Sequence, residues 1–203
     1  MSAGLGEAHQ EPINRRRALR IAVGAVTVST SAILLSTAPA NALQHLWSSC
    51  TRCRGVWFTG NGTRGSCPAG NIFDGGHHSS GLDLVLKTRE DGGAGQSGWN
   101  WCGACQGLWF AGNNSFGVCP GNAYGHRPLS QVGLQPGVFS SDYVIEDIDH
   151  RDRSGGLSGW RWCSKCSGLW DNNSPGSVCP RDHAPHTLAG SGNYVLRRFG
   201  ATR

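Results

Sequence analysis

The chain has 203 residues, a formal net charge of +5 and only 15% charged residues. Its 31 glycines and scarce large aliphatic side chains leave little material for an ordinary hydrophobic core of this length. We therefore expect cross-links or metal ions to stabilise the fold. No dense run of lysine or arginine follows residue 42, which disfavours nucleic acid as a partner.

Residues 1–42 have the three parts of an export signal. Adjacent arginines, Arg15 and Arg16, precede a mildly apolar run, and the small residues of 38–42 form an A-x-A cleavage site. This order resembles a twin-arginine signal, which implies export of an already folded protein to the outside of the cell. The apolar run is shorter than the ~20 residues of a spanning helix. We expect cleavage after Ala42 and no transmembrane segment in the mature protein.

The mature chain consists of three degenerate copies of one unit. Their first cysteines are separated by 52 and 61 residues, and an insertion near 127–141 accounts for the difference. All nine cysteines and all eight tryptophans fall inside the repeated pattern. The predicted boundaries are 43–96 for the first copy, 97–157 for the second and 158–203 for the third.

Each copy predicts three short β-strands, and no window of the mature chain has a helical period. The first strand flanks the first cysteine, and the second contains a Leu-Trp or Val-Trp step. The third is a run of valine, leucine or isoleucine near the end of the copy. The fold class is therefore all-β. Three copies of this length favour a pseudo-threefold arrangement that resembles a β-trefoil in outline. Three zinc-pinned hairpin modules in tandem are the alternative.

Every copy contains Cys-x2-Cys, a third cysteine after 12 or 13 intervening residues, and a downstream histidine. Three thiolates and one imidazole are a common donor set for a structural zinc ion, and the repetition makes the pattern specific. We predict about three zinc ions, held by Cys50, Cys53, Cys67 and His77; by Cys102, Cys105, Cys119 and His126; and by Cys163, Cys166, Cys179 and His186. The glycines that follow each pair, Gly55, Gly107 and Gly168, are expected to have a positive φ.

Two alternatives stay open at these sites. His78 competes with His77, and His183 competes with His186, because both members of each pair lie at usable spacing. Disulfides are natural in an exported cysteine-rich chain, although three cysteines per copy would leave one thiol over in each.

A tryptophan and an asparagine recur after each Cys-x2-Cys pair. Aromatic faces stack on sugars and amides bond to hydroxyls, so these pairs predict a binding module for extracellular carbohydrate. The candidate ligand-binding residues are Trp57, Asn61, Trp109, Asn113, Trp170 and Asn172. The other interpretation is that these tryptophans cover the core, as we expect of Trp47, Trp99 and Trp160, and that the asparagines shape turns.

Nothing in the sequence predicts a catalytic residue, and an enzyme is the less favoured class. The dense charge cluster 146–153 occurs in one copy only and is interpreted as a solvated turn. The alternatives to a glycan-binding module are a secreted zinc-dependent hydrolase, in which one site exchanges a ligand for water, and a structural or metal-sequestering protein.

Overall fold

The computed structural model describes residues 43–128, 140–152 and 154–200. The predicted signal peptide and most of the predicted insertion near 127–141 lie outside these ranges. The described part of the chain contains nine β-strands, one short 3-10 helix and no α-helix, so the all-β prediction is confirmed. No helix within these ranges has the length and apolar content needed to cross a bilayer.

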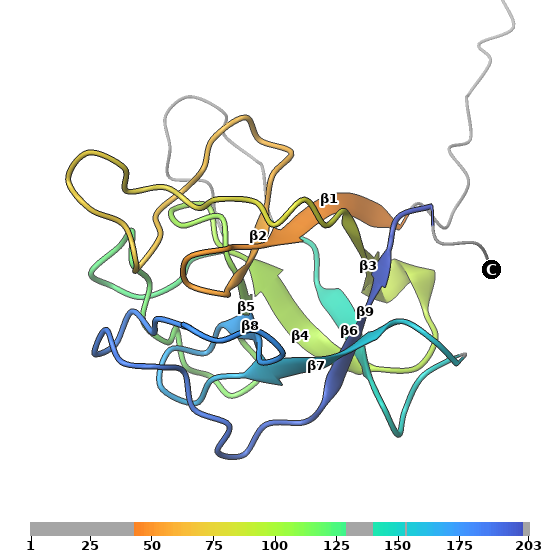
Figure 1. The fold of residues 1–203 in the computed structure, drawn as a ribbon. Helices are drawn as coiled ribbons and strands as arrows, with labels where there is room; N and C mark the ends of the chain where they lie inside the picture. The colour runs from red at the N-terminus through yellow and green to blue at the C-terminus, as the bar shows by residue number, and fades with distance from the viewer. Residues whose placement is uncertain (1–42, 129–139, 153, 201–203) are drawn as a thin grey trace, which may run out of the picture. The chain divides into compact units, whose positions relative to one another are not determined.

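The strands follow the same order in each copy (Figure 1). The first strand of a copy leads to the first cysteine, the second follows the Cys-x2-Cys turn, and the third ends the copy. The strands are β1 (Gln44–Ser49), β2 (Val56–Phe58), β3 (Leu84–Thr88), β4 (Gln96–Trp101), β5 (Leu108–Phe110), β6 (Tyr143–Asp147), β7 (Leu157–Trp162), β8 (Leu169–Asp171) and β9 (Tyr194–Arg198), with the 3-10 helix η1 at Arg89–Asp91.

Antiparallel pairing joins these strands into one nine-stranded sheet. Within a copy, the first strand pairs with the second and the third: β1 with β2 and β3, β4 with β5 and β6, and β7 with β8 and β9. Between copies, the third strands pair with one another as β3–β6, β6–β9 and β3–β9. Strands of different copies therefore share backbone hydrogen bonds, unlike those of separate hairpin modules.

Three tryptophans form the centre of the core. Trp47, Trp99 and Trp160 are at most 1% exposed and pack with the branched residues of the third strands. Trp47 meets the ring of Tyr143 edge-on at 5.2 Å, and Trp99 meets Tyr194 in the same way at 5.1 Å. The core interpretation of these three tryptophans is therefore confirmed, and large rings fill the volume that scarce aliphatic residues leave.

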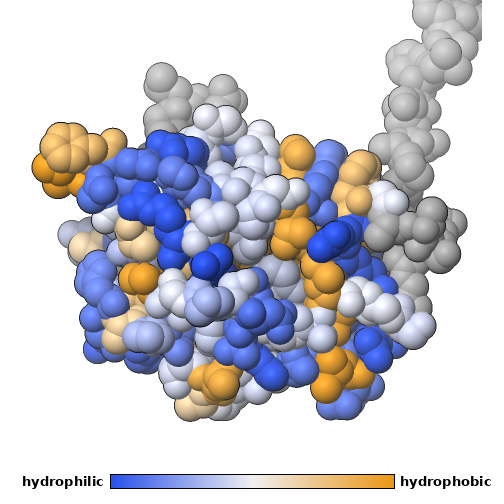
Figure 2. Space-filling model, in the orientation of Figure 1, coloured by the Kyte–Doolittle hydropathy of each residue, from blue (hydrophilic) through white to orange (hydrophobic). Residues whose placement is uncertain are grey.

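The most exposed large apolar side chains lie on a loop rather than on the sheet. Ile72 and Phe73 are 92% and 91% exposed on the loop between β2 and β3, whose apolar tip stands out in Figure 2. Asn71 holds this tip, because its side-chain oxygen accepts hydrogen bonds from the backbone N–H groups of Phe73 and Asp74, both at 2.9 Å. The loop that connects Cys67 to His77 is thereby shaped by local bonds.

Candidate metal centres

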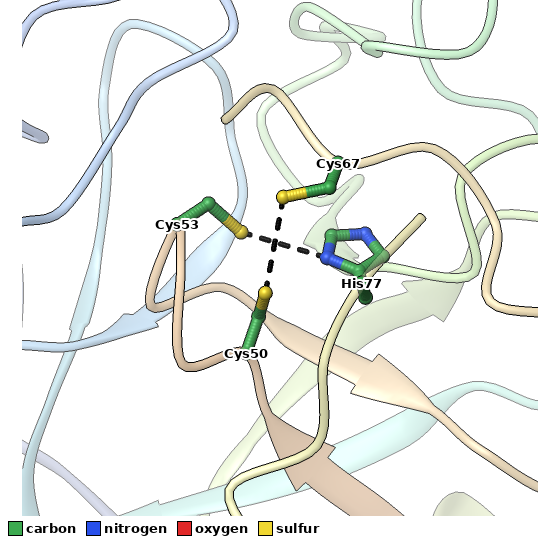
Figure 3. Close-up of side chains that lie close together, drawn as sticks. All are labelled: Cys50, Cys53, Cys67 and His77. Carbon is green, nitrogen blue, oxygen red and sulfur yellow. Dashed lines mark hydrogen bonds between the residues drawn. The ribbon is translucent and has the colours of Figure 1, made fainter. Parts of the chain in front are cut away.

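Each copy brings its three cysteines and one histidine together. In the first copy, Cys50 and Cys53 lie on the turn between β1 and β2, whereas Cys67 and His77 come from the loop between β2 and β3. Figure 3 shows the four side chains converging on one point. All four donor atoms lie within 4.8 Å of one another, and the same holds for the equivalent sets in the other copies.

The spacing of the donors is nearly identical in the three clusters. The first-to-third cysteine sulfur distances are 3.8, 3.7 and 3.9 Å, and the distances from the second sulfur to histidine Nδ1 are 3.5, 3.5 and 3.6 Å. A disulfide bond is about 2.05 Å long, so these sulfurs are not bonded. All nine cysteines are free and buried. Four converging donors of this kind could hold one metal ion in each cluster.

The histidine alternatives are separated by geometry. The Nδ1 atoms of His77 and His186 face cysteine sulfurs, as predicted. His78 turns away and places Nε2 2.5 Å from a carboxylate oxygen of Asp74, while the exposed His183 lies 3.2 Å from the carbonyl of Pro68. His78 and His183 are outside the clusters.

Without a cation, ionisation of all three thiols of a cluster is disfavoured. Hydrogen bonds with Cys53 and Cys67 lower the pKa of the Cys50 thiol. The same contacts with Cys50 raise the pKa of Cys67 to about 11 and that of Cys53 well above its usual range. One negative charge is thus tolerated and further ones are disfavoured, so three thiolates require a positive ion between them.

The backbone of the Cys-x2-Cys turn differs from the expectation in one respect. The residue with positive φ is the one directly after the second cysteine: Arg54 at 67°, Gln106 at 64° and Ser167 at 65°. The prediction for Gly55, Gly107 and Gly168 was wrong in this sense. A Cβ at Gly107 would lie 3.3 Å from the second cysteine's sulfur, a tight approach, whereas at Gly55 and Gly168 it would lie at an ordinary contact distance of 3.5 Å.

The three turns also contact one another in a ring. The carbonyl of each positive-φ residue accepts a hydrogen bond from a strand of a different copy: Phe58 N–H to Gln106, Phe110 N–H to Ser167 and Asp171 N–H to Arg54, each at 2.9 Å. With Nδ1 of His77 facing the sulfurs, its Nε2–H donates to the carbonyl of Cys105 at 3.1 Å. Each Cys3His cluster is therefore positioned partly by the turn of its neighbour, a second layer of contacts that the sequence pattern did not reveal.

The predicted sugar platform requires a correction. Trp57, Trp109 and Trp170 are only 4%, 2% and 5% exposed, so none offers a ring face to a ligand. Each instead stacks on the histidine of its own cluster, at centroid distances of 5.3, 5.4 and 5.2 Å. These rings pack against the imidazoles and cover the Cys3His clusters.

The partner asparagines divide into two kinds. Asn61 donates to the side-chain oxygen of Gln106 at 2.8 Å, and Asn113 accepts from the backbone N–H of Ser115 at 3.2 Å. Both are therefore engaged in local structure. The exposed side chain of Asn172 has no hydrogen-bond partner among the described residues and lines a groove of about 530 Å³ with Ser174 and Leu188.

One charged residue was placed wrongly by the sequence interpretation. Glu146 begins the cluster interpreted as a solvated turn, yet it is 5% exposed. It lies at the position of its copy that Lys87 and Arg197 occupy in the others, and it forms ion pairs with both. Superposing the three branched runs at 85–87, 144–146 and 195–197 is the signal that could have found this trio.

The comparisons with known proteins add no family to these observations. No protein-family model, no curated protein and no solved structure matches the chain significantly.

Proposed function

We propose that the protein is an exported binding scaffold whose fold is held by three structural zinc ions. The three buried Cys3His clusters carry this proposal. With zinc–sulfur bonds of about 2.3 Å and zinc–nitrogen bonds of about 2.0–2.1 Å, tetrahedral edges are about 3.8 Å between sulfurs and about 3.6 Å between sulfur and nitrogen. The observed sulfur–sulfur distances of 3.7–3.9 Å and sulfur–nitrogen distances of 3.5–3.6 Å fit both edges.

The donor set also favours a structural role over hydrolysis. A catalytic zinc keeps one position for water, whereas four protein donors already converge in each cluster. Three thiolates around a divalent ion leave a net charge of −1, which N–H groups can stabilise. Arg52 N–H and His78 N–H each lie 3.4 Å from the sulfur of Cys50.

We further propose that the three copies are arranged about a pseudo-threefold axis, as in a β-trefoil. Two observations support this arrangement: the same strand pairs recur in each copy, and the hydrogen bonds between the turns run in one cyclic order. A binding scaffold of this kind keeps a rigid interior and presents its loops for recognition.

Export rests on the leader sequence. Arg15 and Arg16 stand ahead of the apolar run at the twin-arginine spacing, and folding before transport would let the thiols acquire metal in a reducing compartment.

Replacing both arginines by lysine is expected to block secretion of the protein into the medium, measured by immunoblotting of cell and medium fractions. Normal secretion of the double variant would contradict the assignment.

A polymeric carbohydrate is the ligand class that we propose for the scaffold. The groove beside the third cluster supports it, because the Asn172 amide, which has no partner within the described ranges, and the half-exposed Leu188 line the same space. Hydroxyl groups of a sugar can bond to the amide while its apolar face covers the leucine.

Asn172→Ala is expected to reduce binding to a polysaccharide at least tenfold, measured by depletion onto insoluble chitin and cellulose and on a glycan array. Asn113→Ala is the control, since Asn113 is the asparagine of the second copy's Trp–Asn pattern and its side chain takes part in a local turn. Equal binding by both variants, or no binding by the native protein, would refute the carbohydrate proposal.

A further inference from the structure

A second pocket lies at the opposite end of the described sheet from the metal centres. The third strands of the copies, β3, β6 and β9, pair with one another there, while β2, β5 and β8 lie toward the clusters (Figure 1). The pocket has a volume of about 200 Å³. Each copy contributes a valine, a large aliphatic residue and a charged residue: Val85, Leu86 and Lys87; Val144, Ile145 and Glu146; and Val195, Leu196 and Arg197.

The charged residues of this pocket are held in a fixed network. Glu146 lies 3.2 Å from Lys87 and 2.6 Å from Arg197, and its side chain is only 6% exposed. Lys87 also pairs with Asp152 at 2.7 Å, and Asp152 lines the same pocket. Among the described residues that line the pocket, two cations and two anions balance, so this lining favours a neutral ligand over an ionic one.

Glu146 gives the pocket hydrogen-bond acceptor capacity. Lys87 donates hydrogen bonds to the carbonyl oxygen of Ala94 and to a carboxylate oxygen of Asp152, both at 2.7 Å, and forms an ion pair with Glu146 at 3.2 Å. Each carboxylate oxygen of Glu146 takes part in one ion-pair contact, with Lys87 or Arg197, whereas a carboxylate can accept about four bonds in all. The Glu146 carboxylate is therefore suited to a ligand that donates hydrogen bonds.

We propose that this pocket binds a single neutral sugar unit. Hydroxyl groups would donate to the Glu146 carboxylate, and charge assistance makes such bonds strong. The apolar C–H face of the ring would lie against the three valines. The volume is below the roughly 300–1,000 Å³ of pockets for drug-sized ligands, which limits the occupant to about one ring. The proposal rests on the carbohydrate function for its ligand class, but it names a site that shares no residue with the Asn172 groove.

The source of the sugar is open to test, because a free monosaccharide and the terminal unit of a glycan present the same ring. Methyl glycosides of glucose, galactose, mannose and N-acetylglucosamine are suitable probes, together with soluble oligosaccharides that end in each of them. A one-ring pocket predicts that a methyl glycoside and the matching oligosaccharide bind with affinities within about threefold of each other. An affinity that rises steadily with chain length would overturn the pocket in favour of the groove.

Val85 allows the site to be altered without cutting the ion-pair network. Val85 is half-buried, so Val85→Phe can fill the pocket, and Val85→Ala is the matched control that enlarges it. We expect Val85→Phe to weaken binding of the methyl glycoside at least tenfold and Val85→Ala to change it less than threefold, by saturation-transfer NMR titration. Metal content and melting temperature establish that both variants are folded.

A second readout needs no variant. In the native protein, the methyl resonances of Val85, Val144 and Val195 should shift together on addition of the glycoside, while those of Leu188 stay unchanged. The pocket proposal would be overturned if only the Leu188 resonances shifted, if Asn172→Ala lost binding, and if Val85→Phe kept it. The groove would then be the binding site. Absence of binding to every probe would also overturn the pocket proposal. The polysaccharide assay tests the carbohydrate function separately.

Discussion

Replacing Cys105 by serine is expected to unfold the whole described domain and to release all three metal ions. Serine cannot supply the thiolate, and a structural zinc site contributes an apparent ~10–16 kcal/mol, as much as the ~5–15 kcal/mol by which a typical domain is stable. The loss spreads because the turn that contains Cys105 accepts hydrogen bonds from Phe58 N–H and from His77 Nε2–H, both in the first copy.

The measurements are the number of metals bound per chain and the hydrogen-exchange protection of each copy. Ala104→Ser is the matched control, because Ala104 lies inside the same turn but is not a donor. It should keep three metals and the native near-ultraviolet spectrum of the tryptophans. Retention of two metals and of protected first and third copies in Cys105→Ser would show that the copies are independent modules.

Gly117→Ala is expected to destabilise the protein far more than Gly176→Ala. Both glycines lie before the third cysteine of their copy and both have a positive φ, 57° and 78°. A Cβ at Gly117 would lie 2.2 Å from the carbonyl oxygen of Cys166. A Cβ at Gly176 would have open space around it in the described part of the chain. Both substitutions incur a φ strain of about 1–2 kcal/mol. The difference between their losses of stability therefore measures how closely one copy approaches the Cys-x2-Cys turn of the next.

We expect Gly176→Ala to lower the free energy of unfolding by about 1–2 kcal/mol and Gly117→Ala to lower it by more than about 3 kcal/mol, near the exceptional end of single substitutions. Urea titrations of the metal-loaded proteins measure both values. Gly65→Ala should resemble Gly117→Ala, since a Cβ there would lie 2.2 Å from the carbonyl oxygen of Cys105. Equal losses at all three positions would mean that the copies do not press against one another.

The metal ligands could be predicted because the same residue types recur at the same places. One Cys-x2-Cys pair is ambiguous, but three pairs with a third cysteine and a histidine define a donor set without any knowledge of the fold. The short strands were predictable for a similar reason, since branched and aromatic runs recur between glycine-rich turns. His77 and His186 occupy the clusters that their spacing suggested.

The contacts between copies could not be predicted from the same pattern. Arg54, Gln106 and Ser167 differ in side-chain size and charge, because their common role depends on a backbone φ and a carbonyl direction. Composition also cannot tell a ligand-facing tryptophan from one that covers a histidine, so Trp109 was assigned to the wrong surface. Glu146 was misplaced because a charged run is normally solvated, and its burial depends on cations that two other copies supply.

The most direct test of the zinc-held fold is the mass of the mature protein under native and denaturing conditions, with a count of reactive thiols. The predicted result is a native mass larger by three zinc ions and nine alkylatable cysteines after denaturation in chelator. A metal-free native mass with eight cysteines in disulfides would contradict it.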